Sequence, residues 1–229
     1  MKKLIYIVAF IFGFTSYVSA NPSINIGVSL TGGVFDAAGE EIFSGDHSSD
    51  TTSTKVSKKT SAEGDDAETL FGLGSVFVEA SINDVISVGI DYVPHGVDSE
   101  TTENVQGSDA PGSARVTNTV DVSFDDYRTV YLLLKSEIGA YFKAGYTEID
   151  VTTNEKLNTG GKYGDTTLEG TIFGIGYNHE LNDGMFVRAE YNIMDFDDVT
   201  LTNTADSNKS IKASDIEGYG ARISVGKSF

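Results

Sequence analysis

The 229-residue sequence contains no cysteine, which matters because its first residues resemble an export signal. Two lysines precede the apolar run LIYIVAFIFGF, and VSA at positions 18–20 supplies the small residues of a cleavage site. An exported chain without cysteine cannot be held together by disulfides, so a small disulfide-stapled fold is excluded. We expect residues 1–20 to be a signal peptide and residues 21–229 to form a single domain.

Basic residues are also scarce. Sixteen Lys and Arg residues stand against 34 Asp and Glu residues, giving a formal net charge of -18. Such a chain is repelled by phosphate backbones, so nucleic acid is excluded as a partner. After residue 20 the sequence has no apolar run approaching the roughly 20 residues of a membrane helix. A membrane protein that crosses with alternating strands remains open.

Eight segments show the alternation of apolar and polar residues that is typical of strands. In one of them, Ile86, Val88, Ile90 and Tyr92 alternate with smaller or polar residues. In the fourth segment both parities are apolar, so the sequence leaves its two faces unassigned. The predicted strands lie near 23–34, 70–82, 85–93, 118–135, 140–151, 168–180 and 185–199, and in the closing stretch GYGARISVGKSF.

The connections between these segments alternate strictly between short and long. SINDVI, KSEIGA and ELNDGM have the Asn, Asp and Gly content of tight hairpin turns. The other connections, near 35–69, 94–117, 152–167 and 200–216, are long, polar segments that we predict to be loops. This order predicts an all-β fold, an eight-stranded antiparallel up-and-down barrel with unlike ends.

The composition of the strand face opposite the apolar one indicates whether the apolar face points into the barrel or outward into lipid. It is rich in Gly, Ser, Thr and Asn, which suit a narrow lumen, whereas the surface of a soluble ligand carrier would carry more charge. Aromatic residues on the apolar parity also fall near strand ends, as in the girdles of membrane barrels. These observations favour a transmembrane β-barrel. The aromatic residues are Tyr92, Tyr146, Tyr177, Tyr191, Tyr219 and Phe229.

The closing stretch resembles the C-terminal strand signature of Gram-negative outer-membrane barrels. The match rests on Phe229, Val225, Ile223 and Ala221, whereas Lys227 departs from the usual pattern. The stretch GIGYNHELNDGMFVRAEYNIMDFDDV is similar to the sixth-to-seventh hairpin of small surface proteins of the OmpA, OmpX and opacity type. This resemblance implies a monomer in the outer membrane of a Gram-negative bacterium. It also implies outer-membrane lipid, lipopolysaccharide and the barrel-assembly machinery as partners.

Six charged residues share the polar parity and are expected in the lumen. Three acids therefore face three bases, and they can form either a structural plug of ion pairs or a gated polar conduit. One pair is specific, because Glu190 and Arg222 should lie opposite each other across the last hairpin. Counting from the tight turns places Glu79, Lys143 and Arg188 at one depth, and Asp91, Glu190 and Arg222 slightly higher.

Other motifs favour neither catalysis nor a cofactor. The acidic clusters EGDDAE and DFDDV lack the spacing of an EF-hand. The glycine-rich tripeptides GLG, GIG and GYG lack the rest of a nucleotide-binding fingerprint. His47, His95 and His179 lie in separate segments, and Glu180 beside His179 points to the opposite face of its strand. We therefore predict no enzyme activity, no metal and no cofactor.

The sequence thus predicts a surface or structural protein of the outer membrane with a packed lumen. It would present four acidic, polar loops, which are where an extracellular ligand would bind. The alternative from a different class is a narrow, porin-like channel for small solutes or ions.

Overall fold

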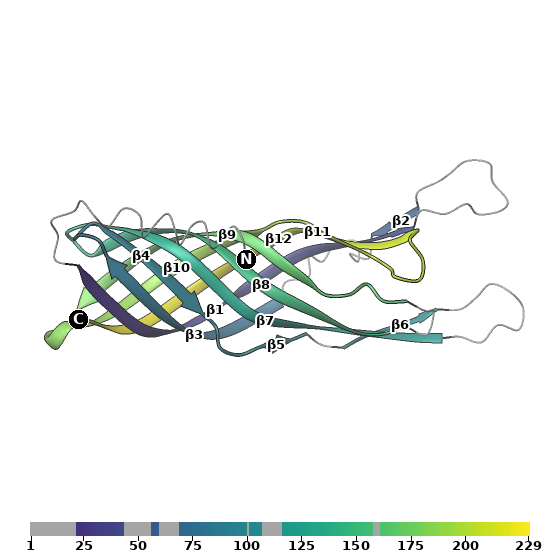
Figure 1. Cartoon of the computed structure of the whole chain (residues 1–229), viewed down its shortest axis with the longest axis horizontal. Coiled ribbons are helices and arrows are strands. Elements are labelled where there is room, and N and C mark those ends of the chain that lie inside the picture. The colour runs from purple at the N-terminus through teal and green to yellow at the C-terminus, as the bar shows by residue number, and fades with distance from the viewer. Residues whose placement is uncertain (1–21, 44–55, 60–68, 100, 107–115, 158–160) are drawn as a thin grey trace, which may run out of the picture.

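The computed structural model describes residues 22–43, 56–59, 69–99, 101–106, 116–157 and 161–229, so the expected signal peptide lies outside the described residues. Eight long strands form a ring, and each is antiparallel to its neighbours (Figure 1). They are β1 (Ser23–Phe43), β3 (Thr69–Ser81), β4 (Ile86–Tyr92), β7 (Val116–Lys135), β8 (Ala140–Lys156), β9 (Thr166–Glu180), β10 (Met185–Phe196) and β12 (Lys209–Ser228).

The first and last strands close the ring. β1 pairs with β12 in a register that begins at Asn25 opposite Ser228. The Phe229 N–H donates a 2.9 Å hydrogen bond to the Ile24 carbonyl, and the Ile24 N–H donates one of 3.2 Å to the Phe229 carbonyl. Closure pairs the backbone groups that would otherwise be unsatisfied in lipid. The predicted eight-stranded up-and-down barrel is confirmed.

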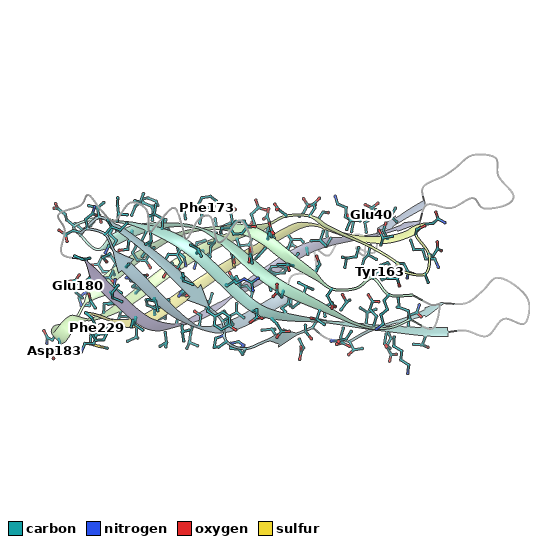
Figure 2. All side chains as sticks on the ribbon, viewed as in Figure 1. Glu40, Tyr163, Phe173, Glu180, Asp183 and Phe229 are labelled. Atoms are coloured by element: carbon teal, nitrogen blue, oxygen red, sulfur yellow. The ribbon has the colours of Figure 1, made fainter. Side chains whose placement is uncertain are left out.

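The two ends of the barrel differ, as the alternation of short and long connections predicts. One end holds tight turns, among them a short 3-10 helix, η1 (Asn182–Gly184), which contains Asp183 in the left-handed region (φ 61°). Figure 2 shows Glu180, Asp183 and Phe229 at this end, and Glu40 and Tyr163 at the other. Within the described residues, no helix has the length and apolarity needed to cross a membrane.

Parts of the four segments predicted to be loops are strands. β1 continues to Phe43 and β8 to Lys156, while β7, β9 and β12 begin earlier than predicted. These extensions reach beyond the barrel at the end where β2 and β6 lie (Figure 1). They escape a period-2 analysis because polar residues occupy both of their parities. Four short strands accompany them: β2 (Val56–Lys59), β5 (Val97–Asp98), β6 (Thr102–Gln106) and β11 (Val199–Thr202).

The apolar parity of the strands faces outward. Leu30 is 73% exposed and Ile223 63%, whereas their inward-facing neighbours Ser29 and Ser224 are buried. Figure 2 shows Phe173 on the outer surface of the barrel. A continuous apolar belt around a closed barrel is typical of a surface that faces lipid. In β7, whose faces the sequence left unassigned, Leu132 and Leu134 are the exposed side chains, and Tyr131 and Leu133 are buried inside the barrel.

Outward-facing tyrosines mark the boundary of this belt on the side of the long connections. The Tyr92 hydroxyl donates a 2.7 Å hydrogen bond to Asp126, and the Tyr146 and Tyr219 hydroxyls donate to Glu169 and Glu217. An apolar ring whose hydroxyl reaches a carboxylate fits the level where hydrocarbon gives way to polar headgroups.

Candidate functional site: the charged lumen

The six charged residues predicted to face the lumen lie there and are nearly inaccessible to solvent. They come from strands β3, β4, β8, β10 and β12, at positions where the small residues of the polar parity leave room inside the ring. The structure joins them in three ion pairs, which are Arg188 with Glu79, Arg222 with Asp91, and Lys143 with Glu190.

Arg188 and Glu79 form the pair with the most partners. Arg188 Nη2 lies 2.8 Å from Glu79 Oε2 and Nη1 contacts Oε1, so the guanidinium binds both carboxylate oxygens in a bidentate pair. Glu79 also accepts hydrogen bonds from the Tyr131 hydroxyl (2.8 Å) and from Asn25 Nδ2 (3.3 Å). Both charges are therefore compensated, as burial requires.

Aromatic rings enclose the Arg188 guanidinium. Its Cζ lies 4.5 Å from the centre of the Phe186 ring and 5.7 Å from that of Phe77. Cations are attracted to the faces of such rings, most strongly where water is excluded. Arg188 Nε in addition donates a 2.9 Å hydrogen bond to Asn178 Oδ1. The arginine thus ties β3, β9 and β10 together across the lumen.

The second pair spans the lumen between β12 and β4. Arg222 Nη2 contacts Asp91 Oδ2 and also the hydroxyl of Ser29 on β1. The Ser75 hydroxyl donates a 3.2 Å hydrogen bond to the same Asp91 oxygen. These contacts connect four strands that are not all neighbours in the wall.

The prediction of an ion pair between Glu190 and Arg222 is wrong, because each of them pairs with another residue. The two residues do lie opposite each other in the register of β10 and β12. However, Glu190 Oε1 lies 3.0 Å from Lys143 Nζ, and its other oxygen accepts a 2.8 Å hydrogen bond from the Tyr141 hydroxyl. Arg222 turns to Asp91 because a long side chain in a narrow lumen can reach a wall that is not adjacent.

Above the charges, toward the long connections, the lumen is apolar. Buried side chains of β8, β9, β10 and β12 pack there, with Phe35 and Phe71 against them. A cavity of about 20 Å³, room for about one water molecule, separates this layer from Asp91 and Arg222. The buried members of the layer are Ile149, Leu168, Ile172, Met194, Phe196 and Ile216.

Sequence reasoning missed the neutral residues of the network. Tyr131 and Tyr141 supply hydroxyls to Glu79 and Glu190, and Asn25 and Asn178 complete the shell of the Arg188 pair. The asparagines lie on the polar parity and could have been found by that signal. Tyr131 could not, because it lies in TVYLLLK, where both parities are apolar.

The four residues of the C-terminal signature lie on the outer face of β12 and at the chain end. Ile223 and Val225 are exposed toward lipid, Ala221 is exposed beside them, and Phe229 is 70% exposed at the end with the tight turns. None of them contributes to the lumen.

Of the two acidic clusters, EGDDAE lies outside the described residues. In DFDDV, Asp198 Oδ2 lies 2.6 Å from Lys212 Nζ on the exposed extension of β12. The hydrogen bond and the charge of Asp198 raise the pKa of Lys212 above its ordinary value. This is a solvated surface pair of small energetic weight.

A closed ring of eight strands with an apolar outer belt and a charged interior defines a β-barrel of the outer membrane. The chain belongs to the family described as outer membrane protein beta-barrel domain, whose model matches residues 8–229. Its place is accordingly the outer membrane of a Gram-negative bacterium. No curated protein matches the chain significantly.

Several solved structures are similar to this chain at low sequence identity. The outer membrane protein OprG from Pseudomonas aeruginosa is 14% identical, with a TM-score of 0.52 over 90% of this chain and 95% of its own. The outer membrane protease OmpT from Escherichia coli is 8% identical, with a TM-score of 0.42 over 94% of this chain and 100% of its own. The attachment invasion locus protein Ail of Yersinia pestis is 10% identical, with a TM-score of 0.38 over 90% and 99%. At 14% identity and a TM-score of 0.52, the likeness to OprG shows the fold alone.

Proposed function

We propose that the protein is a monomeric surface protein of the outer membrane, which holds its long, polar end outside the cell on a barrel that does not conduct. The observation that carries the proposal is the filled lumen, where three ion pairs and an apolar layer lie in series. An eight-stranded barrel is just wide enough for side chains to fill it.

The runner-up is a narrow channel for ions or small solutes. The charged layer of the lumen favours a channel, because its side chains would attract ions if the three ion pairs separated. The apolar layer above argues against it, since packed apolar side chains oppose the passage of charge. Our proposal includes no catalytic role, because His95 is engaged by backbone groups and His179 and Glu180 are adjacent residues on opposite faces of β9.

The proposed partners follow from the surfaces. The apolar belt would contact outer-membrane lipid, and the tyrosine boundary would lie against lipopolysaccharide. The outward-facing C-terminal residues support recognition by the barrel-assembly machinery. The polar extensions beyond the barrel are where an extracellular ligand would bind.

The orientation of the barrel can be tested by labelling single cysteines, because the native chain has none. Asn208→Cys places a thiol in the exposed turn between β11 and β12, and Asp183→Cys places one in the exposed turn at the opposite end. We expect a membrane-impermeant maleimide to label Asn208→Cys on intact cells. Asp183→Cys should be labelled only after the outer membrane is permeabilised, because the tight turns of such barrels face the periplasm.

A cysteine-free wild-type control measures background labelling in both conditions. Labelling of Asp183→Cys but not Asn208→Cys on intact cells would show that the barrel is inserted the other way, and the proposed surface role would then be wrong.

A further inference from the structure

The barrel wall is interrupted on one side of β3. β3 pairs with β1 along its whole length, from Ser81 opposite Ser23 to Thr69 opposite Phe35. Its pairing with β4 on the other side runs only from Ser81 to Val76, which lies opposite Tyr92. Within the described residues, no strand pairs with 69–75 on that side. We call this interruption, between 69–75 and 93–98, the seam.

Pro94 explains where the seam begins. If the β3–β4 register continued, Pro94 would lie opposite Gly74, and proline has no N–H to donate to the ladder. The chain instead stays with β7. The Val93 N–H donates a 2.9 Å hydrogen bond to the Tyr127 carbonyl, and β5 then pairs Val97 with Phe124.

The imidazole of His95 bridges the seam at Gly74. The Gly74 N–H donates a 3.1 Å hydrogen bond to His95 Nε2, which takes the place of the missing strand carbonyl. For Nε2 to accept, the ring proton must be on Nδ1, and Nδ1 lies 3.4 Å from the Gly96 carbonyl that can receive it. One neutral tautomer therefore satisfies both contacts.

The seam leads into the lumen. The cavity of about 20 Å³ is lined by Phe71 and Leu73 from one side of the seam, by Val93 from the other, and by Tyr127 behind it. The seam starts next to Tyr92, whose hydroxyl marks the boundary of the apolar belt. Its unpaired backbone groups consequently face headgroups and water, which can satisfy them, and not hydrocarbon.

We propose that His95 is a pH-sensitive latch that holds the seam closed when its ring is neutral. Histidine changes charge between about pH 5 and 8. Protonation would place a hydrogen on Nε2, which would then face the Gly74 N–H as a second donor. The hydrogen bond is lost and the seam opens as pH falls; it closes again as pH rises and the proton leaves.

The charges around His95 support this direction of movement. The 69–75 segment of β3 has no titratable side chain, so that side offers a protonated ring no new partner. On β7, Asp125 packs closely against Gly96 and Asp126 holds the Tyr92 hydroxyl, while Arg128 is bound by Glu148. In the lumen, Asp91 is engaged by Arg222. A charged imidazole would thus be drawn toward Asp125 and away from β3.

Spin labels on Leu70→Cys and Asp98→Cys span the seam from two exposed positions, and pulsed dipolar spectroscopy measures the distance between them. In the otherwise wild-type chain we expect a narrow distribution at pH 8 that becomes broader and longer at pH 5.5. His95→Gln retains an oxygen acceptor that does not titrate, so its distribution should stay narrow at both pH values. His95→Lys carries a charge and no acceptor, and its distribution should be broad at both.

The matched control places labels on Leu70→Cys and Val34→Cys, which lie directly opposite each other in the intact β1–β3 ladder. This distance should not depend on pH. The proposal is overturned if the seam distance is unchanged at pH 5.5, if His95→Gln still responds to pH, or if the control pair changes as much as the seam pair.

Discussion

Replacing Arg188 with Met should lower the free energy of unfolding in lipid vesicles by about 3–5 kcal/mol, the usual cost of leaving a buried charge without its partner. The substitution removes both contacts with the Glu79 carboxylate and the packing of the guanidinium against Phe186. Glu79 is 1% exposed and would keep only the weaker hydrogen bonds from Tyr131 and Asn25. The chain has no tryptophan, so unfolding in urea is followed by far-ultraviolet circular dichroism, which measures the loss of unfolding free energy.

Two comparisons separate the lost pair from a general effect of the substitution. Adding Glu79→Gln to Arg188→Met should recover part of the loss, because the uncompensated charge is then gone as well. Lys212→Met, which removes an exposed pair with Asp198, should leave the unfolding free energy nearly unchanged. If the losses at Glu79 and Arg188 simply add, the pairing does not contribute to stability.

Replacing Gly27 with Leu should prevent most of the protein molecules from folding. A Cβ at this inward position would lie 2.5 Å from the Val225 carbonyl oxygen and closer still to the ring of Phe77. The backbone oxygen belongs to the neighbouring strand β12 and cannot move without breaking the closure of the ring. Overfilling a packed interior costs about 1–3 kcal/mol or more, and a backbone clash adds to it. The folded fraction on unheated gels after refolding into detergent measures the effect.

Val28→Leu is the matched control, since it enlarges the next residue on the same strand. Val28 is 58% exposed on the outer face, and a larger apolar side chain there meets only lipid. It should fold like the wild type. Equal folding of Gly27→Leu and Val28→Leu would refute the assignment of the inner and outer faces.

The eight barrel strands could be predicted because each must satisfy two environments at once. Leu30 and Ser29 differ in chemistry because one faces lipid and the other the lumen, and that contrast appears as a period of two. The extension of β1 beyond this belt, to Phe43, could not be predicted in this way. Both of its faces lie outside lipid, so no contrast between the parities is required.

The charged residues of the lumen could be predicted, but the partner of each could not. Register places Glu190 beside Arg222, and a sequence can be read only for such neighbours along the wall. Which charge meets which depends on how far each side chain reaches across the lumen, and this brings Lys143 to Glu190. The seam had one signal, Pro94, whose missing N–H limits a ladder, but His95 as its closing group requires the geometry.

Single-channel recording in planar bilayers tests the central claim, a lumen closed by paired charges and an apolar layer, most directly. The wild-type protein, refolded and inserted at a density checked by quantitative gel analysis, should show no stable unitary current steps, while a general porin recorded in the same bilayers confirms sensitivity. Stable steps of one size that change in Lys143→Ala, which alters only the lumen, would contradict the claim and favour a channel.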